Sequence, residues 1–177
     1  MYAWKHFKTI TLHRFLVMKG CFRCGLYLQG LTHDLSKYSP VEFMVGARYY
    51  KGNMSPNNQE RRERGYSSAW LHHKGRNRHH AEYWIDYGFG SGETLIGMRM
   101  PDRFIAEMFV DRVSAAKVYQ KEAYTDESAW KYYLKGRDKG IMHPEVEEIL
   151  SRLLRMLAEE GEDAVYHYIR TVLLNKK

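Results

Sequence analysis

The sequence predicts an all-α protein: a single helical bundle of 177 residues. Apolar residues recur every three or four positions through most of the chain, which is typical of amphipathic helices. Two serine–proline pairs, Ser39-Pro40 and Ser55-Pro56, have the pattern of helix starts, because proline suits the first helical position. A chain of this length with 44% hydrophobic residues and no biased segment can bury a core of its own, so we expect one domain.

Four helices are expected in the first half of the chain. Helical spacing of apolar residues predicts the first over about 4–24 and the second over about 25–37. The third begins at a capping box formed by Ser39 and Glu42. The fourth starts at Pro56 and continues as a polar helix towards position 73.

The second half begins with an interruption. Four glycines within 84–100 predict a loop or a small hairpin that is inserted into the bundle. An amphipathic helix follows Pro101, and its apolar stripe also contains Asp111. Packing helices are expected over about 125–175, with a stop at Gly161.

The charge of the chain is concentrated in one half. The net charge is +7, but residues 1–84 hold 14 Lys and Arg against 5 Asp and Glu, whereas residues 85–177 hold 14 against 16. The basic half is therefore expected to attract anions. The chain carries neither a long apolar stretch nor a cleavable apolar leader, and two cysteines agree with a reducing compartment, so a cytoplasmic location is expected.

Nine histidines are placed unevenly, and they point to a metal site. Four of them crowd into nine positions as His72, His73, His79 and His80. Imidazole and carboxylate groups are good ligands for divalent transition metals, and helices can aim such groups into a bundle. His13 and Asp111 lie on apolar helix faces, where a buried carboxylate needs a cation or a hydrogen-bond partner.

The segment Leu31-Thr32-His33-Asp34-Leu35-Ser36-Lys37 resembles the signature of the HD-domain superfamily of metal-dependent phosphohydrolases, in which an adjacent His-Asp pair ends an apolar helix and is followed by a small residue and Lys. His13 and Asp111 match that family's first-helix histidine and late aspartate, and the resemblance covers about residues 10–120. It implies an all-helical fold that holds one or two divalent ions (Mn, Fe, Co, Ni or Zn). The implied ligands are His13, His33, Asp34 and Asp111. In members with two metals, Asp34 would bridge the ions. The second site would use one histidine from His72/His73 and one from His79/His80; His73 and His80 are favoured, and the choice within each pair stays open.

The resemblance also implies a function: a cation-activated water hydrolyses a phosphoester, such as that of a nucleotide. Asp34 and Lys37 are the expected catalytic residues, and the expected substrate contacts are Lys37, Arg48, Lys74 and Arg76, all in the basic half. A phosphorylated small molecule is then the partner. A nucleic acid is less favoured, no membrane partner is expected, and the C-terminal helices offer a surface for a homodimer.

Two other functions are compatible with the same residues. A similar ligand set that holds two irons or two manganese ions supports redox chemistry, such as that of an oxygenase or a catalase-like enzyme, because a fold does not determine the reaction. The second alternative is a basic helical module without enzymatic activity, which binds nucleic acid or a phosphorylated metabolite and carries a purely structural metal.

Overall fold

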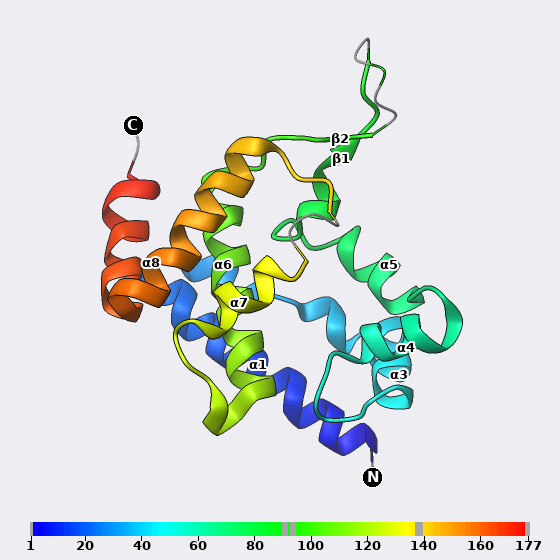
Figure 1. The fold of residues 1–177 in the computed structure, drawn as a ribbon. Helices are drawn as coiled ribbons and strands as arrows, with labels where there is room; N and C mark the ends of the chain where they lie inside the picture. Colours follow the sequence, from blue (N-terminus) through cyan, green and yellow to red (C-terminus); the bar gives the residue numbers. More distant parts are fainter. Residues whose placement is uncertain (1, 90–91, 93–94, 137–139, 176–177) are drawn as a thin grey trace.

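The computed structural model describes residues 2–89, 92, 95–136 and 140–175, and the protein is built there almost entirely from helices (Figure 1). The α-helices of these residues are α1 (Tyr2–Arg23), α2 (Tyr27–Thr32), α3 (Pro40–Arg48), α4 (Pro56–Arg64), α5 (Ser68–Lys74), α6 (Asp102–Gln120), α7 (Ser128–Leu134) and α8 (Pro144–Tyr168). Short 3-10 turns cover Leu35–Tyr38, Ala81–Trp84 and Lys121–Ala123, and a π-helical turn, Ile169–Leu173, follows α8. The predicted all-α class is confirmed.

The glycine-rich segment contains a small antiparallel hairpin. Strands β1 (Ile85–Asp86) and β2 (Ile96–Gly97) pair with Ile85 opposite Gly97. The hairpin projects from the helical body in Figure 1. Part of the predicted loop, residues 90–91 and 93–94, lies outside the described residues.

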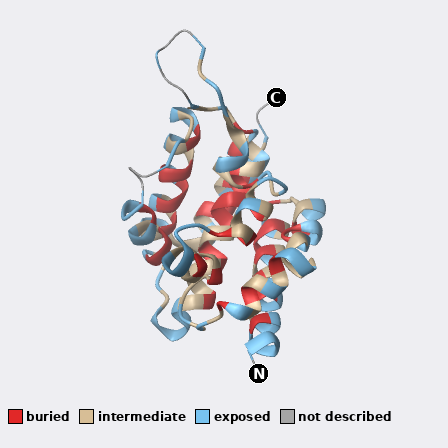
Figure 2. Ribbon diagram, turned by 90° about the vertical axis from the view of Figure 1, so that its right-hand side faces the viewer, coloured by how far each residue is buried: buried red, intermediate tan, exposed pale blue. Residues whose placement is uncertain are grey.

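Helix α6 is the centre of the packing. It contacts α1, α7 and α8, and Figure 2 shows the buried residues gathered along the middle of the molecule. The predicted apolar stripe of α8 is confirmed, because Leu150, Leu153, Leu154 and Leu157 are all fully buried. The burial of apolar side chains such as these is the main contribution to the stability of the bundle.

A glycine allows α1 to approach α6 closely. A Cβ atom at Gly20 would lie 2.5 Å from Cγ1 of Val110 and 2.9 Å from the hydroxyl of Tyr166, so only glycine fits at this crossing. His13 lies two turns before Gly20 on the same buried face of α1. The close crossing therefore brings His13 up to the middle of α6, where Asp111 lies.

The predicted second helix is wrong in its length. Instead of running to Lys37, α2 ends at Thr32, and the chain turns through His33 (ψ 128°) and Asp34 (φ 52°, ψ 28°) before the next 3-10 turn. Asp34 thus adopts the left-handed conformation, which aspartate tolerates better than most residues. The His-Asp pair sits in a break between helical segments, and both side chains are buried.

The predicted fourth helix is two helices. Gly65 adopts φ 80° and ends α4, and Ser67 then caps α5 by accepting a hydrogen bond from the backbone N–H of Trp70. The predicted stop at Gly161 is a kink inside α8, since this residue has φ 84° and ψ 177°. In both places a glycine with positive φ relieves the strain that a side chain would cause.

The segment around Thr125 begins its helix later than expected. The first residue of α7 is Ser128, whose hydroxyl accepts a hydrogen bond from the Thr125 backbone N–H at 2.9 Å. Cys21 and Cys24 are both free and buried in the core, where burial raises the pKa of each thiol, so neither thiol has an accessible, reactive form. No helix of the described chain is long and apolar enough to cross a bilayer.

Candidate metal centre

The fold gathers seven histidine and aspartate side chains that could bind a metal from four separate parts of the chain. α1 supplies one histidine, the turn after α2 supplies the His-Asp pair, α6 supplies an aspartate, and α5 with the turn that follows it supplies three histidines. These residues are His13, His33, Asp34, His73, His79, His80 and Asp111. They form two sets that share Asp34, which we call the first and second half-sites. A third group with metal-ligand spacing joins His33 and His79 to Glu107.

The first half-site consists of His13, His33, Asp34 and Asp111. Its histidine Nε2 atoms face both carboxylates. The Nε2 atom of His33 lies 3.2 Å from Oδ2 of Asp34 and 3.5 Å from Oδ1 of Asp111, and the Nε2 atom of His13 lies 3.0 Å from the latter oxygen. The structure therefore brings together the four residues that the HD-like pattern selects.

The second half-site consists of Asp34, His73, His79 and His80. It faces the other carboxylate oxygen of Asp34: Oδ1 lies 3.3 Å from Nε2 of His73 and 3.5 Å from Nε2 of His79. The Nε2 atoms of His73 and His80 are 2.9 Å apart. Both His79 and His80 lie in this half-site, so the prediction that only one of the two is a ligand does not hold for the grouping. His72 does not belong to it, and its Nδ1 atom lies 2.7 Å from the carboxylate of Glu42.

Several buried polar atoms of the centre lack a well-directed hydrogen bond within the described residues, although charged groups such as the Lys37 ammonium lie close to them. They are Nε2 of His13, His33 and His79, and both carboxylate oxygens of Asp34. An unsatisfied buried polar atom costs about 1–3 kcal/mol, and more if it is charged. Five such atoms that converge on one aspartate fit the donor set of divalent transition-metal ions, which would satisfy them all. The donor chemistry and the orphaned atoms thus agree with a metal centre.

Two glutamates contact the Nδ1 atoms of the ligand histidines, on the side of each ring away from Asp34. Oε1 of Glu107 lies 2.8 Å from Nδ1 of His33 and 3.3 Å from Nδ1 of His79. Oε2 of Glu42 lies 2.8 Å from Nδ1 of His73. A carboxylate on the outer nitrogen orients a ligand imidazole and leaves its other nitrogen free for the metal.

Neither glutamate is among the residues selected from the sequence. Glu107 precedes Asp111 by one helical turn, so its place on the same face of α6 is a signal that the sequence contains. Glu42 is predicted only as a capping residue. The Ser39 hydroxyl does accept a hydrogen bond from the Glu42 N–H, but the Glu42 side chain turns to the histidines instead of back to the helix end.

Both aspartates of the centre are ionised. Burial opposes this, but the neighbouring His33, Lys37 and His73 hold the pKa of Asp34 well below its ordinary value. The close imidazoles of His13 and His33 do the same for Asp111. Glu107 is also held low, with a pKa of about 2, because its bonds to His33 and His79 outweigh its burial. The centre therefore presents carboxylates in the form that binds cations.

The pKa shifts of four histidines of the centre go in two directions: those of His13 and His80 are downward, and those of His33 and His73 are upward. Burial lowers the pKa of His13 and, with the help of His79 and His73, that of His80. Burial opposes the charged form of His33 and His73 as well, but Asp34 raises the pKa of His33 well above its ordinary value and that of His73 to about 8. Without a cation, protons on these two imidazoles balance the carboxylates.

Lys37 adjoins the centre, as expected. Its ammonium nitrogen lies 2.6 Å from Oδ2 of Asp34, and about a quarter of the side chain is exposed. Although burial acts in the opposite direction, Asp34 and Asp111 raise the pKa of Lys37, so the amine stays protonated. It can donate hydrogen bonds but cannot accept a proton at neutral pH.

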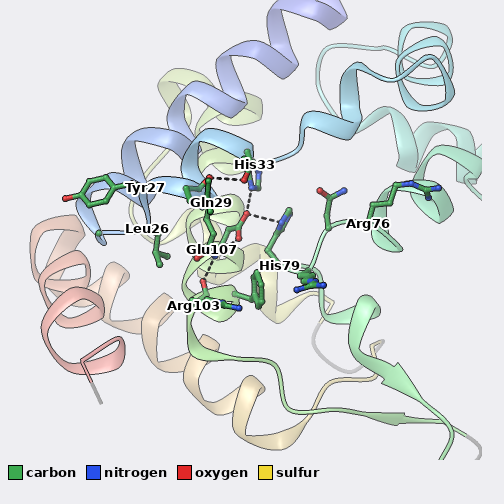
Figure 3. Close-up of a pocket in the computed structure, with 14 residues that line it drawn as sticks. Leu26, Tyr27, Gln29, His33, Arg76, His79, Arg103 and Glu107 are labelled. Carbon is green, nitrogen blue, oxygen red and sulfur yellow. Dashed lines mark hydrogen bonds and ion pairs between the residues drawn. The ribbon is translucent and has the colours of Figure 1, made fainter. Parts of the chain in front are cut away.

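The other predicted phosphate contacts lie apart from these ligands. Arg76 lines a cavity of about 820 Å³ that also touches His33 and His79 (Figure 3). Arg48 is exposed at the end of α3, where its guanidinium lies over the ring of Tyr49, and Lys74 is the half-buried last residue of α5. Of these three, only Arg76 is among the residues that line this cavity.

The comparison with known proteins identifies the family. The chain matches the model of a family described as "Family of unknown function (DUF5662)" over residues 2–156. That range includes both half-sites together with Glu42 and Glu107. No curated protein matches the chain, and no solved structure does. Because the match covers most of the sequence, the chain belongs to the DUF5662 family of unknown function.

Proposed function

We propose that the protein is a cytoplasmic, metal-dependent enzyme that hydrolyses a phosphoester, such as that of a nucleotide. The observation that carries this proposal is the position of Asp34, whose two carboxylate oxygens face two different sets of imidazole nitrogens. A carboxylate in this position suits two adjacent cations, which is the usual arrangement for phosphoryl-group hydrolysis. The resemblance to the HD-domain superfamily supports the same reaction class.

Each half-site has residues suited to hold one cation. His13, His33 and Asp111 would hold the first ion, and His73, His79 and His80 the second, with Asp34 shared. Cations bound there supply a water nucleophile at neutral pH and offset negative charge on the phosphoryl oxygens.

The side chains around the ions have separate tasks. Glu107 and Glu42 keep the imidazoles in the orientation that leaves Nε2 free. Protonated Lys37, partly exposed beside Asp34, donates hydrogen bonds to a phosphoryl oxygen and orients the substrate.

A metal and activity assay tests the proposal. The protein is purified without added metal, its metal content is measured by elemental analysis, and it is assayed on phosphomonoesters and phosphodiesters. Wild type is compared with Asp34→Asn and with Asp86→Asn, which changes an exposed carboxylate on β1. Hydrolysis by wild type and Asp86→Asn, with loss of both metal and activity in Asp34→Asn, is the expected result. Metal-loaded protein that is inert on all phosphoesters would contradict it.

A second candidate function is redox chemistry on two irons or two manganese ions. The observation that favours it is the number of imidazoles at the second half-site, where three histidines accompany one carboxylate, that of Asp34. The same protein preparation separates the two reactions. A coloured di-iron species that consumes oxygen, or evolution of oxygen from peroxide without phosphoester cleavage, would favour this candidate over hydrolysis.

A further inference from the structure

The solvent-facing side of α1 carries large apolar side chains. One side of this helix is buried and packs against α6, and its N-terminal turns are exposed at the lower end of the molecule in Figure 2. On the opposite side, Trp4, Leu12 and Phe15 are 60%, 49% and 51% exposed. They share that side with Lys8 and Lys19, since these five positions follow one another at intervals of three or four. We call these five residues the outer face of α1.

The lysines of the outer face lie beside its aromatic rings. The ammonium nitrogen of Lys8 lies 5.2 Å from the ring centre of Trp4, and that of Lys19 lies 5.7 Å from the ring centre of Phe15. Neither lysine, nor the nearby exposed Lys5, takes part in an ion pair with any described residue. Their carbon stems can cover apolar surface while the ammonium groups remain available to an anion.

The surroundings of the outer face continue the same chemistry. Residues 2–41 contain six Lys and Arg but one acidic residue, Asp34, which is buried. Helix α2 packs against α1 and adds Leu28 and Leu31, which are 74% and 55% exposed. Arg14 of α1 donates to the Leu31 carbonyl at 3.1 Å and so ties the two helices together. The surface of α1 and α2 is therefore both apolar and cationic, which marks a site of interaction.

The combination of charge and apolar area selects the partner. A symmetric dimer through the outer face would place lysines opposite lysines, with no exposed carboxylate from residues 2–41 to pair with them. Nucleic-acid phosphates would bind the lysines but would leave Leu12 in water. An anionic lipid surface satisfies both groups, because its headgroups meet the ammonium groups and its acyl boundary takes up the apolar side chains. Tryptophan is well suited to that boundary, since its ring is apolar and its N–H is polar.

We infer that the outer face of α1 binds the surface of an anionic lipid bilayer, with the helix axis parallel to the membrane. The expectation of no membrane partner considered a long apolar stretch, which spanning requires and surface binding does not. His13 lies on the buried side of α1, so docking leaves the metal centre covered. The inference goes beyond the proposed hydrolysis and does not depend on it.

The test is sedimentation of the protein with vesicles of phosphatidylcholine alone and of phosphatidylcholine mixed with phosphatidylglycerol. Wild type should bind the mixed vesicles more tightly. The double variant Lys8→Gln/Lys19→Gln should bind them about 30-fold more weakly, because each lysine at an anionic surface contributes about fivefold in affinity. The control Lys131→Gln/Lys135→Gln removes the same charge from exposed positions at the end of α7 and should bind like wild type.

A second pair of variants tests the apolar part of the face. Phe15→Ser should weaken binding to the mixed vesicles about tenfold, because an aromatic side chain no longer enters the acyl boundary. Tyr132→Ser, which removes an exposed aromatic ring from α7, should leave binding unchanged. Thermal melting of each variant by circular dichroism identifies any loss of binding that is due to unfolding.

Several outcomes would overturn the inference. They are the absence of binding to mixed vesicles, equal binding by the two double-lysine variants, and full binding by Phe15→Ser. A dimer in sedimentation velocity that Phe15→Ser abolishes would instead assign the face to a second copy of the chain. Asp34→Asn should bind vesicles like wild type even where it has lost metal and hydrolysis, so failure of the hydrolase proposal and failure of this inference are distinguishable.

Discussion

Glu107→Gln should weaken both half-sites at once, although this glutamate belongs to neither. One of its oxygens contacts Nδ1 of His33, a ligand of the first half-site, and Nδ1 of His79, a ligand of the second. Glutamine keeps the size of the side chain but removes the negative charge that strengthens both hydrogen bonds. The imidazoles then become weaker donors to a cation and are less firmly oriented.

The distances set the expected size of each effect. The contact to His33 is 2.8 Å, typical of a charge-assisted hydrogen bond, so its loss should cost about 2 kcal/mol, or about 30-fold in affinity at the first half-site. The contact to His79 is 3.3 Å and weaker, so the second half-site should lose about 1 kcal/mol, or about fivefold. Glu42→Gln is the matched comparison, because Glu42 contacts His73 but no ligand of the first half-site. It should weaken the second ion alone.

The assay is competition with a fluorescent chelator, which reports the number of ions per chain and the affinity of each. Wild type should bind two ions, and Glu148→Gln, at an exposed position on α8, serves as the control. Two unchanged affinities in Glu107→Gln would refute the reasoning about the shared carboxylate. A loss confined to one ion in Glu107→Gln, or loss of both ions in Glu42→Gln, would refute the division into two half-sites.

Three further predictions concern stability. Gly20→Ala should lower the free energy of unfolding by about 1–2 kcal/mol in urea titrations, because the added methyl group overpacks a helix crossing, whereas Gly75→Ala, with no neighbour closer than 3.6 Å, should not. An unchanged free energy of unfolding in Gly20→Ala would show that the crossing has room for the methyl group. Leu154→Ala should cost about 2–5 kcal/mol by leaving a cavity in the core, and a loss below 1 kcal/mol would mean that α8 repacks. Burial and then Lys37 lower the pKa of His6 to about 4, so between pH 6.5 and 4 the unfolded chain binds a proton that the folded chain excludes. The free energy of unfolding should therefore fall by about 1–2 kcal/mol more in wild type than in His6→Leu over that range, and parallel pH profiles would contradict this.

Local sequence features account for most of the helices. The stripe of α8, the Ser39 cap of α3 and the amphipathic pattern of α6 each depend on residues a few positions apart, so their effect is visible without the fold. The breaks are harder to predict. The chain leaves the helix at His33 although nothing in the local pattern requires it, and Asp34 takes up a left-handed conformation that glycine adopts more readily.

The first half-site could be selected from the sequence because a short motif and two residues on apolar helix faces already mark it. The second could be located only to two pairs of histidines. The members of each pair are neighbours in the chain, and the packing of α5 against α3 brings His73 to Asp34 and leaves His72 on Glu42. His79 and His80, which follow α5, both join the half-site.

The sequence by itself determined the helical class, the order of the helices and the identity of four candidate ligands, since periodicity and motif order are properties of nearby residues. Only the tertiary structure decided that Asp34 faces two donor sets and that Glu107 and Glu42 support the histidines. The physical reason is that these arrangements depend on distances between atoms far apart in the chain. Helix crossings such as the one at Gly20 set those distances, and no local pattern encodes them.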